Sequence, residues 1–561
     1  MPRNPLYPLA LAAFAFLIAA AHAAPASAKN IPPPYRDQPV REDTAVDHDG
    51  RPIVAPAERD PSLWGHLFRE AIVEPISHAF DIPNKIIWVA GIAGVEKNQE
   101  ASNVNAFDEV PNSSWFTNRN HVRHVSEADV RAGSFGEKRP APPYEVKSIK
   151  KKGFNPGFNI KDSAGNRWVV KLDAPGHPRI SSGAGVVSGR LIRAAGFNIS
   201  HDEAFIFRRD ELKLDPDLVQ GKDGEEPFSE ENLDSLLVRG AQADAGVYHA
   251  SASLFLPGKV VGPFSFRGSR DDDPNDRFTH KNRRELRGLY VFYSWINNWD
   301  VKDHQSLDTF QTPKDDSLGH VVHHLLDVNG SLGAAAEGPK PIRYGYEQKV
   351  DLGWIAKRFV TLGFVVEPWR RARQETGIPS VGNLESEEFV PDEWRPSQYM
   401  EPFRKMTLGD AYWGAKLVAS FSDAQVDAAI DAAGYEDPRA RAYLRKILLE
   451  RRDKIARYWF ERVAPLDFFE VSGDMLRFHD LAVDRGLVSA RSYEIEAEDD
   501  RGQTVRFDAP IAGTAFRLRD IARDTTHLSL RVGVAGSHAK PVRVELDRSG
   551  SEWVLARVRH G

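Results

Sequence analysis

The segment from residue 283 to residue 327 constrains the fold most, because it orders a helix, a polar loop and two strands. Residues 283–296 predict a long buried helix, since apolar side chains recur on one helical face. These side chains are Leu286, Leu289, Tyr290, Tyr293 and Ile296. The polar loop 298–305 follows, and residues 306–310 and 320–326 then predict two strands joined by a polar turn. The fold must therefore place this loop beside the end of a buried strand.

The loop and the strand end carry side chains suited to phosphoryl transfer. Asp300 stands two residues before Lys302 and five before Gln305, and Asp327 ends the second strand. Asp300 could orient an attacking hydroxyl and Lys302 could bind a phosphate. Gln305 and Asp327 offer oxygen atoms to a divalent metal. Asp, Lys and Gln are also ordinary residues of solvated loops, so the alternative reading is a loop without chemistry.

Two further elements precede this segment. A loop punctuated by Gly153 and Gly157 enters one strand, and residues 164–173 predict a turn and a second strand that carries Lys171. Residues 181–196 predict a helix, which opens on serines and closes on glycine. No Asp or Glu occurs between Ala174 and His201.

Residues 298–305 and Asp327 resemble the catalytic loop and metal-binding Asp of the protein-kinase-like superfamily, in an atypical branch without His-Arg-Asp or Asp-Phe-Gly. This resemblance implies ATP with Mg²⁺ or Mn²⁺ as cofactor, with Gln305 in place of the usual Asn. It implies that Lys171 binds the α and β phosphates of the nucleotide. The loop from Gly153 to Gly157 would then cover those phosphates.

The same resemblance also predicts features that this sequence lacks. The helix 181–196 should carry a carboxylate that pairs with Lys171, and it carries none. Asp202 or Glu203 could substitute from a neighbouring segment. Asn329 stands where the superfamily has glycine.

Three other segments resemble a family of exported bacterial proteins of uncharacterised function, whose members resemble atypical, secreted kinase-like proteins. These segments are residues 104–119, 283–288 and 410–415. The resemblance covers roughly residues 104–463 and implies a fold more than a reaction.

The N-terminus predicts export. Arg3 precedes an unbroken apolar run from Leu9 to Ala21, which is short for a membrane span and is followed by small residues suited to signal-peptidase cleavage. The mature chain is expected to begin near Ala24 or Lys29, in the periplasm or outside the cell. No later run is long and apolar enough to span a membrane.

Overall, the sequence predicts an α+β protein with a two-lobed kinase-like fold, an N-terminal extension and a small C-terminal all-β domain, a sandwich or meander. The expected parts are a signal peptide (1–28), an extension (29–140), an N-lobe (141–265), a C-lobe (266–465) and the β domain (466–561). Six short runs separated by Gly, Asp and Pro predict the strands of the β domain.

Helix-start signals mark the end of the C-lobe. Ser422 and Gln425 form a capping box, Gly434 ends that helix, and Asp437 with Pro438 begins the next.

Composition excludes several classes of protein. The 561 residues contain no cysteine, which excludes disulfides, thiol nucleophiles and zinc–thiolate sites. A net charge of −6 gives no reason to expect nucleic acid as a partner. His320, His323 and His324 do not converge on a strand, so they are expected to be structural or to neighbour the nucleotide pocket and not to form a zinc site. The acidic segment 270–276 offers a calcium loop or, more simply, a solvated turn.

Three functions remain open from the sequence. The first is an exported phosphotransferase that uses ATP and a divalent metal on a hydroxyl of a protein or glycan. The second is a degenerate kinase-like protein that binds a ligand without turnover. The third is an unrelated enzyme with paired carboxylates, such as a glycoside hydrolase built around Asp300, Asp303 or Asp327, although no β/α repeat supports it.

Overall fold

A computed structural model describes residues 49–59, 99–150, 155–220, 226–313, 316–348, 367–506, 511–518 and 525–561. Within them the protein is a mixture of helices and several β-sheets. The predicted signal peptide lies outside the described residues. No helix within these ranges has both the length and the apolar character needed to cross a membrane.

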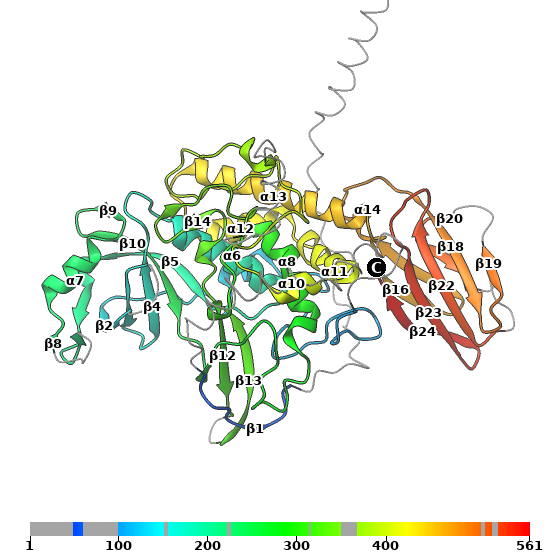
Figure 1. The fold of residues 1–561 in the computed structure, drawn as a ribbon, viewed down its shortest axis with the longest axis horizontal. Coiled ribbons are helices and arrows are strands. Elements are labelled where there is room, and N and C mark those ends of the chain that lie inside the picture. Colours follow the sequence, from blue (N-terminus) through cyan, green and yellow to red (C-terminus); the bar gives the residue numbers. More distant parts are fainter. Residues whose placement is uncertain are drawn as a thin grey trace, which may run out of the picture.

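A seven-stranded sheet forms one end of the molecule, on the left of Figure 1. Its order is β5-β10-β4-β3-β2-β6, with β9 paired to β10, and all neighbours are antiparallel except β2 and β6. The strands are β2 (Tyr144–Ile149), β3 (Gly157–Lys161), β4 (Arg167–Leu172), β5 (Asp202–Arg208), β6 (Leu212–Leu214), β9 (Gln242–Asp244) and β10 (Val247–Leu254).

The two faces of this sheet have different neighbours. On β4, Trp168, Val170 and Leu172 are fully buried in a core that also contains Leu233 and Leu237 of α7 (Glu230–Leu237). Since strand side chains alternate between faces, Lys171 points to the opposite face. Next to α7 lies the small hairpin of β7 (Val219–Gln220) and β8 (Glu226–Pro227).

The predicted helix of residues 181–196 is α6 (Ile180–Ala195), and the predicted helix of residues 283–296 is α8 (Arg284–Ile296). Every residue of α8 is buried, as the apolar periodicity predicted. Both helices belong to the largest core, in the centre of Figure 1. Longer helices that also contribute to this core are α11 (Leu408–Ala419), α12 (Asp423–Ala432) and α13 (Pro438–Phe460).

The helix-start signals of the C-lobe are present as predicted. The Ser422 hydroxyl accepts a hydrogen bond from the Gln425 N–H, and the Gln425 side-chain oxygen accepts one from the Ser422 N–H. Asp437 caps α13, and Pro438 occupies its first turn. Shorter helices are α5 (Glu127–Ala132) and α10 (Glu401–Lys405).

A four-stranded antiparallel sheet extends below the central helices in Figure 1. It contains the two strands predicted after the polar loop, β12 (Ser306–Gln311) and β13 (Leu318–Leu325). The outer strands are β1 (Ile53–Val54) and β11 (Lys259–Gly262), and a separate pair is formed by β14 (Ala334–Ala335) and β15 (Gly338–Pro339).

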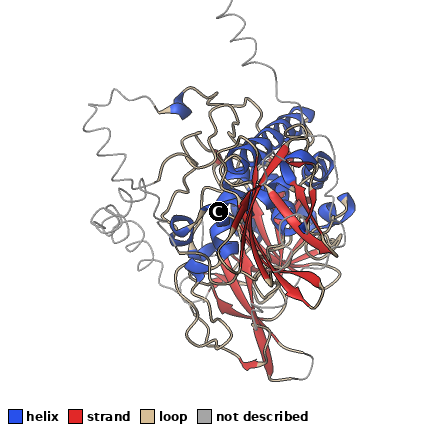
Figure 2. Ribbon diagram, turned by 90° about the vertical axis from the view of Figure 1, so that its right-hand side faces the viewer, coloured by secondary structure: helices blue, strands red, loops and turns tan. Residues whose placement is uncertain are grey.

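Residues 466–561 form two further sheets, of three and six strands, that share one hydrophobic core. Figure 2 views the molecule from the side on which these two sheets lie. Their strands are β16 (Leu466–Ser472), β17 (Met475–Asp480), β18 (Ser492–Asp499), β19 (Thr504–Arg506), β20 (Ile511–Ala512), β21 (Ala515–Arg517), β22 (His527–Val534), β23 (Val542–Ser549) and β24 (Glu552–Arg559), with α14 (Leu481–Asp484) after β17. The six predicted runs are all strands here, whereas β16, β17 and β20 were not predicted. The division of the chain into domains stays a prediction.

Candidate functional site

Lys171 projects from β4 and forms an ion pair with Asp327. Its Nζ lies 2.9 Å from the Asp327 Oδ1, and its side chain is only 12% exposed. In the sheet Lys171 lies opposite Gly157 of β3 and Ser251 of β10. Two residues that the sequence placed in one site are therefore in direct contact, although they are far apart along the chain.

Asp327 lies just after β13, in the left-handed backbone conformation with φ 52°. Asp tolerates this conformation better than most residues, so the chain can turn sharply at the strand end. The Asp327 side chain is 47% exposed. Its partial burial would raise the pKa of the carboxyl, but the cations Lys171, Lys150 and Lys302 outweigh this effect and lower that pKa. Asp327 therefore stays ionised and attracts cations.

Lys150 was not predicted as a site residue. Lys150 comes directly after β2, and its Nζ donates a hydrogen bond to the Asn155 carbonyl oxygen, 3.1 Å away. Burial and the neighbouring Lys171 lower the pKa of Lys150. No local sequence pattern singled out Lys150, because lysines are mostly exposed.

The polar loop brings its three predicted residues together. The Asp300 Oδ2 accepts hydrogen bonds from the Lys302 Nζ at 2.8 Å and from the Gln305 Nε2 at 3.1 Å. Asp300 is thus a partly buried carboxylate that is oriented by a cation and an amide. It retains room to accept a further hydrogen bond.

Two contacts join this loop to the Lys171–Asp327 pair. The Leu326 N–H donates to the Gln305 carbonyl oxygen at 2.9 Å, which holds the end of the loop beside the residue before Asp327. A Cβ added at Gly330 would lie 3.7 Å from the Asp300 Cβ, so the turn after Asp327 packs against Asp300. The described structure therefore brings Lys171, Asp300, Lys302, Gln305 and Asp327 into one region.

Gln305 and Asp327 are the residues that could bind a divalent cation. Both offer oxygen atoms, the ligands that Mg²⁺ and Mn²⁺ prefer. The Gln305 Oε1 is buried and has no hydrogen-bond partner among the described residues. No group of three or more His, Asp or Glu side chains in the described part of the chain is arranged to hold a metal ion. Phosphate oxygens and water would have to complete the coordination.

The glycine loop that was expected to cover the phosphates is only partly described. Gly153 lies outside the described residues. Gly157 is the first residue of β3, where a Cβ would lie 2.2 Å from the Val170 carbonyl oxygen. Gly157 therefore allows β3 to approach β4 beside Lys171.

Asp173 fixes the start of α6, a role that was not predicted. Its carboxylate accepts bonds from the N–H groups of Arg179, Ser181 and Ser182 at 2.8–3.1 Å. It also accepts bonds from both serine hydroxyls, at 2.9 and 2.6 Å. These donors include the free N–H groups of a helix N-terminus, where a negative charge is favourable. Asp173 thus connects the strand of Lys171 to α6.

Of the two predicted substitutes for the missing helix carboxylate, Glu203 already has partners. It forms a buried ion pair with Arg190 of α6 and lies 3.6 Å from the Arg139 Nε. Asp202 is also buried, and its Oδ1 has no hydrogen-bond partner among the described residues. Only Asp202 therefore keeps a carboxylate oxygen without a partner.

The turn after Asp327 packs closely against α6. The Asn329 Nδ2 donates to the Ser251 Oγ at 3.1 Å, and a Cβ added at Gly185 of α6 would lie 2.3 Å from the Asn329 Oδ1. Because Gly185 has no side chain, Asn329 can occupy this position next to the strand neighbour of Lys171.

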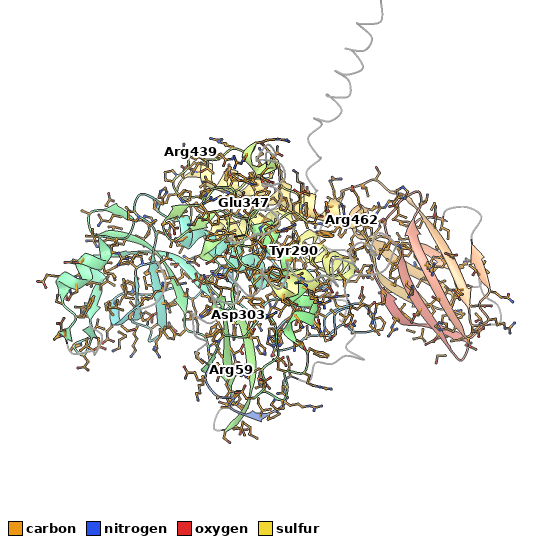
Figure 3. All side chains as sticks on the ribbon, in the orientation of Figure 1. Arg59, Tyr290, Asp303, Glu347, Arg439 and Arg462 are labelled. Carbon is orange, nitrogen blue, oxygen red and sulfur yellow. The ribbon has the colours of Figure 1, made fainter. Side chains whose placement is uncertain are left out.

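The remaining candidates have structural partners. The Asp303 Oδ1 accepts a hydrogen bond from the Phe266 N–H at 3.0 Å, and Figure 3 labels Asp303 between the central helices and β12. His323 bonds to Asp308 at 2.7 Å, and His324 bonds to the Thr309 hydroxyl at 3.1 Å.

The acidic segment 270–276 is held by internal contacts. Asp272 pairs with Arg59 at 2.9 Å, and Asp276 bonds to His280 at 2.6 Å. Several carboxylates of this segment thus have protein partners. Asp273 and Asp276 are also buried, so the segment as a whole is not the solvated turn that was expected.

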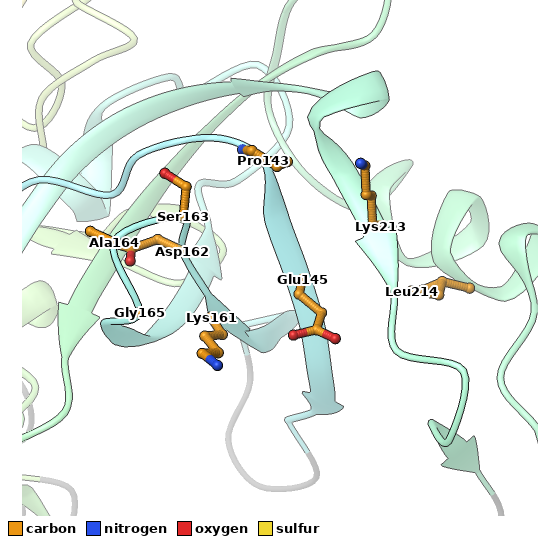
Figure 4. Close-up of a pocket in the computed structure, with 9 residues that line it drawn as sticks. All are labelled: Pro143, Glu145, Lys161, Asp162, Ser163, Ala164, Gly165, Lys213 and Leu214. Carbon is orange, nitrogen blue, oxygen red and sulfur yellow. The ribbon is translucent and has the colours of Figure 1, made fainter.

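A surface hollow of about 560 Å³ lies elsewhere on the seven-stranded sheet (Figure 4). Lys161, Glu145 and Lys213 line it from three neighbouring strands, β3, β2 and β6. Lys161 is at the end of β3 opposite to Gly157, which pairs with Lys171. The hollow is therefore separate from the site around Asp327.

No protein-family model and no curated protein matches this chain. Among solved structures, the chain is similar to the crystal structure of the Golgi casein kinase, with 10% sequence identity and a TM-score of 0.26. The match covers 72% of this chain and 94% of that chain.

Proposed function

We propose that this protein is an atypical kinase-like phosphotransferase that uses ATP and a divalent metal to phosphorylate a hydroxyl group. One observation carries the proposal: the Asp300–Lys302–Gln305 cluster lies beside the ion pair of Lys171 and Asp327. Protein kinases need this set of groups, namely a base-like Asp, a strand lysine, and an amide and a carboxylate for metal.

In this proposal each residue acts through a named atom. The Asp300 carboxylate accepts a hydrogen bond from the acceptor hydroxyl and takes its proton, while Lys302 and Gln305 keep the carboxylate oriented. Lys171 and Lys302 bind phosphate oxygens. Gln305 and Asp327 would hold Mg²⁺ or Mn²⁺, which when bound would neutralise charge on the phosphates.

The arrangement of strands supports the same assignment. Lys171 lies on the third of three consecutive antiparallel strands, α6 follows it, and β5, β6, β9 and β10 complete the sheet. The buried helix α8 then leads into the polar loop. We keep residues 141–265 as the proposed N-lobe and residues 266–465 as the proposed C-lobe, with β11 of the first range paired to β12 of the second.

A second candidate is a degenerate kinase-like protein that binds a ligand without turnover. Lys171 and Asp327 bind each other, α6 has no carboxylate for Lys171, and Gln305 and Asn329 replace the usual residues. The predicted export favours this candidate too, since ATP is expected to be scarce outside a bacterial cytoplasm. A glycoside hydrolase has less support, because Asp303 is bonded to the backbone of Phe266.

The acceptor is proposed to be a hydroxyl of a protein or glycan in the periplasm or outside the cell. Neither a nucleic acid nor a membrane span of the mature chain is part of the proposal.

Thermal unfolding with ATP and Mg²⁺ or Mn²⁺ tests nucleotide binding. At ten times the Kd, binding adds about 1.4 kcal/mol to the stability of the folded state, which raises the Tm by roughly 1–2 °C for a chain of this size. Asp327→Ala should lose this shift, and Lys171→Ala should reduce it. No shift at millimolar nucleotide would refute an ATP site and direct attention to another ligand.

Phosphate incorporation, measured by mass spectrometry, separates turnover from binding. Asp300→Ala should abolish incorporation and leave the nucleotide-induced shift nearly intact, because Asp300 contacts the acceptor and not the nucleotide. Asp303→Ala is the matched control and should keep most activity in protein that is shown to be folded. Equal loss from both variants would mean that the wrong carboxylate has been assigned. Binding without any incorporation by the wild type would support the second candidate.

A further inference from the structure

Arg179, the N-cap residue of α6, is a buried arginine whose guanidinium has no partner in the described part of the chain. It is 8% exposed, and its Nε and Nη1 are buried without a hydrogen bond. Every other buried arginine of the described residues donates from its guanidinium to a protein oxygen, as Arg451 does to the Ser294 carbonyl. Because a buried guanidinium without hydrogen bonds is costly, a fold that keeps one has a reason to keep it.

Asp173 is in contact with Arg179 but does not satisfy its guanidinium. The backbone N–H of Arg179 donates to the Asp173 Oδ2 at 3.1 Å. The same carboxylate accepts four more hydrogen bonds, from the N–H and hydroxyl groups of Ser181 and Ser182. Asp173 therefore balances charge at the start of α6, while the guanidinium protons of Arg179 stay without an acceptor.

Two further polar side chains belong to the same place. The His249 carbonyl of β10 accepts a hydrogen bond from the Asp173 N–H at 3.1 Å, and the His249 Nδ1 is buried without a partner among the described residues. Tyr435, in the loop between α12 and α13, reaches the first turn of α6, since a Cβ added at Gly183 would lie 2.5 Å from its hydroxyl oxygen. Figure 1 shows α6 and α12 beside each other in the centre of the molecule.

The charges of these groups act on one another. Burial lowers the pKa of His249, and the positive charge of Arg179 lowers it further. Burial and Asp173 raise the pKa of the Tyr435 hydroxyl, and Arg179 opposes them. A charge shifts a pKa in this way only from a short distance. The side chains of Arg179, His249 and Tyr435 are thus neighbours, although they come from a helix, a strand and a loop.

Glu436 connects this cluster to the surface. It follows Tyr435 and is exposed, and its negative charge acts on both Arg179 and His249. Glu436 does not accept a hydrogen bond from the Arg179 Nε or Nη1. The guanidinium is therefore available to an anion that enters past Glu436 and makes closer contact.

We propose that Arg179, His249 and Tyr435 form a second site, which binds a phosphate group and is distinct from the proposed nucleotide site. A guanidinium fork matches the oxygen atoms of a phosphate, and a negative charge is favourable near a helix start. Donors on three elements also require an acceptor with several oxygens, and a phosphate monoester has three. The ligand is either free phosphate or a phosphorylated side chain.

A phosphate at this position would connect α6, β10 and the loop between α12 and α13. Helix α6 also packs against the turn after Asp327, where a Cβ added at Gly185 would lie 2.3 Å from the Asn329 Oδ1. Binding would therefore stabilise the helix that supports the candidate site. The inference does not depend on the proposed function, because it concerns binding in the absence of nucleotide and metal.

Phosphorus NMR tests the inference by titration of the full chain with inorganic phosphate at constant ionic strength. The wild type should bind phosphate saturably at millimolar concentration. Arg179→Met should weaken this binding about tenfold or more, because charge-assisted hydrogen bonds are lost. His249→Gln and Tyr435→Phe should each weaken it about three- to tenfold. Glu436→Gln should tighten it about two- to fivefold, since a like charge near the anion is removed.

Two variants separate this site from other cations. Arg193→Met removes a half-buried arginine from the last turn of the same helix and should change the phosphate Kd by less than about twofold. Lys171→Ala removes the lysine of the proposed nucleotide site and should change it by less than about threefold. Loss of phosphate binding in Lys171→Ala, with binding kept in Arg179→Met, would place the anion in the nucleotide site and overturn the inference.

The remaining outcomes are also decisive. A wild type that does not bind phosphate saturably refutes the inference, even where ATP binds. Acetate that binds as tightly as phosphate refutes the assignment to a phosphate group. If a peptide with one phosphoserine binds at least as tightly as inorganic phosphate, the ligand is a phosphorylated side chain, and otherwise it is free phosphate. If circular dichroism shows that Arg179→Met does not fold, an unchanged Kd in both Tyr435→Phe and Glu436→Gln still overturns the site.

Discussion

Lys416→Met should destabilise the protein by about 4 kcal/mol at pH 7–8, because it leaves two buried carboxylates without their cation. The Lys416 Nζ lies 2.9 Å from the Glu109 Oε2 and 2.8 Å from the Asp467 Oδ2, and these side chains are less than 10% exposed. Removing one partner of a buried ion pair costs about 3–5 kcal/mol. Because Lys416 pairs with two carboxylates, a loss of about 4 kcal/mol, the middle of that range, is a conservative expectation.

The expected change in Tm follows from the size of the chain. Unfolding entropy near 2.1 cal/mol/K per residue gives about 1.2 kcal/mol/K if all 561 residues unfold together. A loss of about 4 kcal/mol then lowers the Tm by about 3 °C, and by more if a smaller unit unfolds. Lys446→Met is the matched control. Lys446 is 60% exposed and 4.0 Å from Glu450, so its loss should change stability by less than about 0.5 kcal/mol.

The effect of Lys416→Met should depend on pH in a direction that its cause dictates. Burial alone would raise the pKa values of Glu109 and Asp467, but Lys416 outweighs burial and lowers both. A carboxyl group whose folded pKa is lowered stabilises the fold above its unfolded pKa of about 4, and this stabilisation is lost as the pH falls through the folded value. In Lys416→Met, burial without the cation raises both pKa values instead.

The variant should therefore gain stability as the pH falls from 8 to 5, whereas the wild type should not. Scanning calorimetry at several pH values measures this difference. Combining Lys416→Met with Glu109→Gln and Asp467→Asn should recover more than half of the loss, since no buried charge is then left unpaired. A Tm within 1 °C of the wild type at both pH 5 and pH 8 would refute the reasoning.

Two further predictions concern the start of α6 and the N-terminus. Asp173→Ala should lower the free energy of unfolding by about 2–4 kcal/mol, because five hydrogen bonds at a buried helix start are lost. Asp173→Asn should keep part of this free energy. A change below about 1 kcal/mol in calorimetry would contradict this role of Asp173. N-terminal sequencing of protein from outside the cytoplasm should find Ala24 or Lys29 first, whereas intact Met1 on cytosolic protein would rule out export.

Local patterns in the sequence were sufficient for several of the central elements. The apolar periodicity of residues 283–296 predicted α8 within one residue, and the capping residues Ser422 and Asp437 predicted where α12 and α13 begin. These signals are local because a helix face repeats every 3.6 residues and a cap acts within one turn. The strand β17 had a comparable alternation at Leu476 and Phe478, which was overlooked.

The composition of the loop 298–305 also determined part of the candidate site. Asp300, Lys302 and Gln305 are separated by two and three residues, and a single tight turn is enough to bring them together. The order of α8, the loop, β12 and β13 also followed from the sequence, because each of these segments has its own local pattern.

The partners of Lys171 were decided only by the tertiary structure. Asp327 reaches it because the segment before β5 forms a bridge with the end of β13, between Ile199 and Leu325, and because β10 pairs with both β4 and β5. Glu203, which is adjacent to Asp202, pairs instead with Arg190, since alternate strand residues face opposite sides. Pairing between distant strands depends on register, and no local pattern encodes which of two neighbouring carboxylates will face a lysine from another strand.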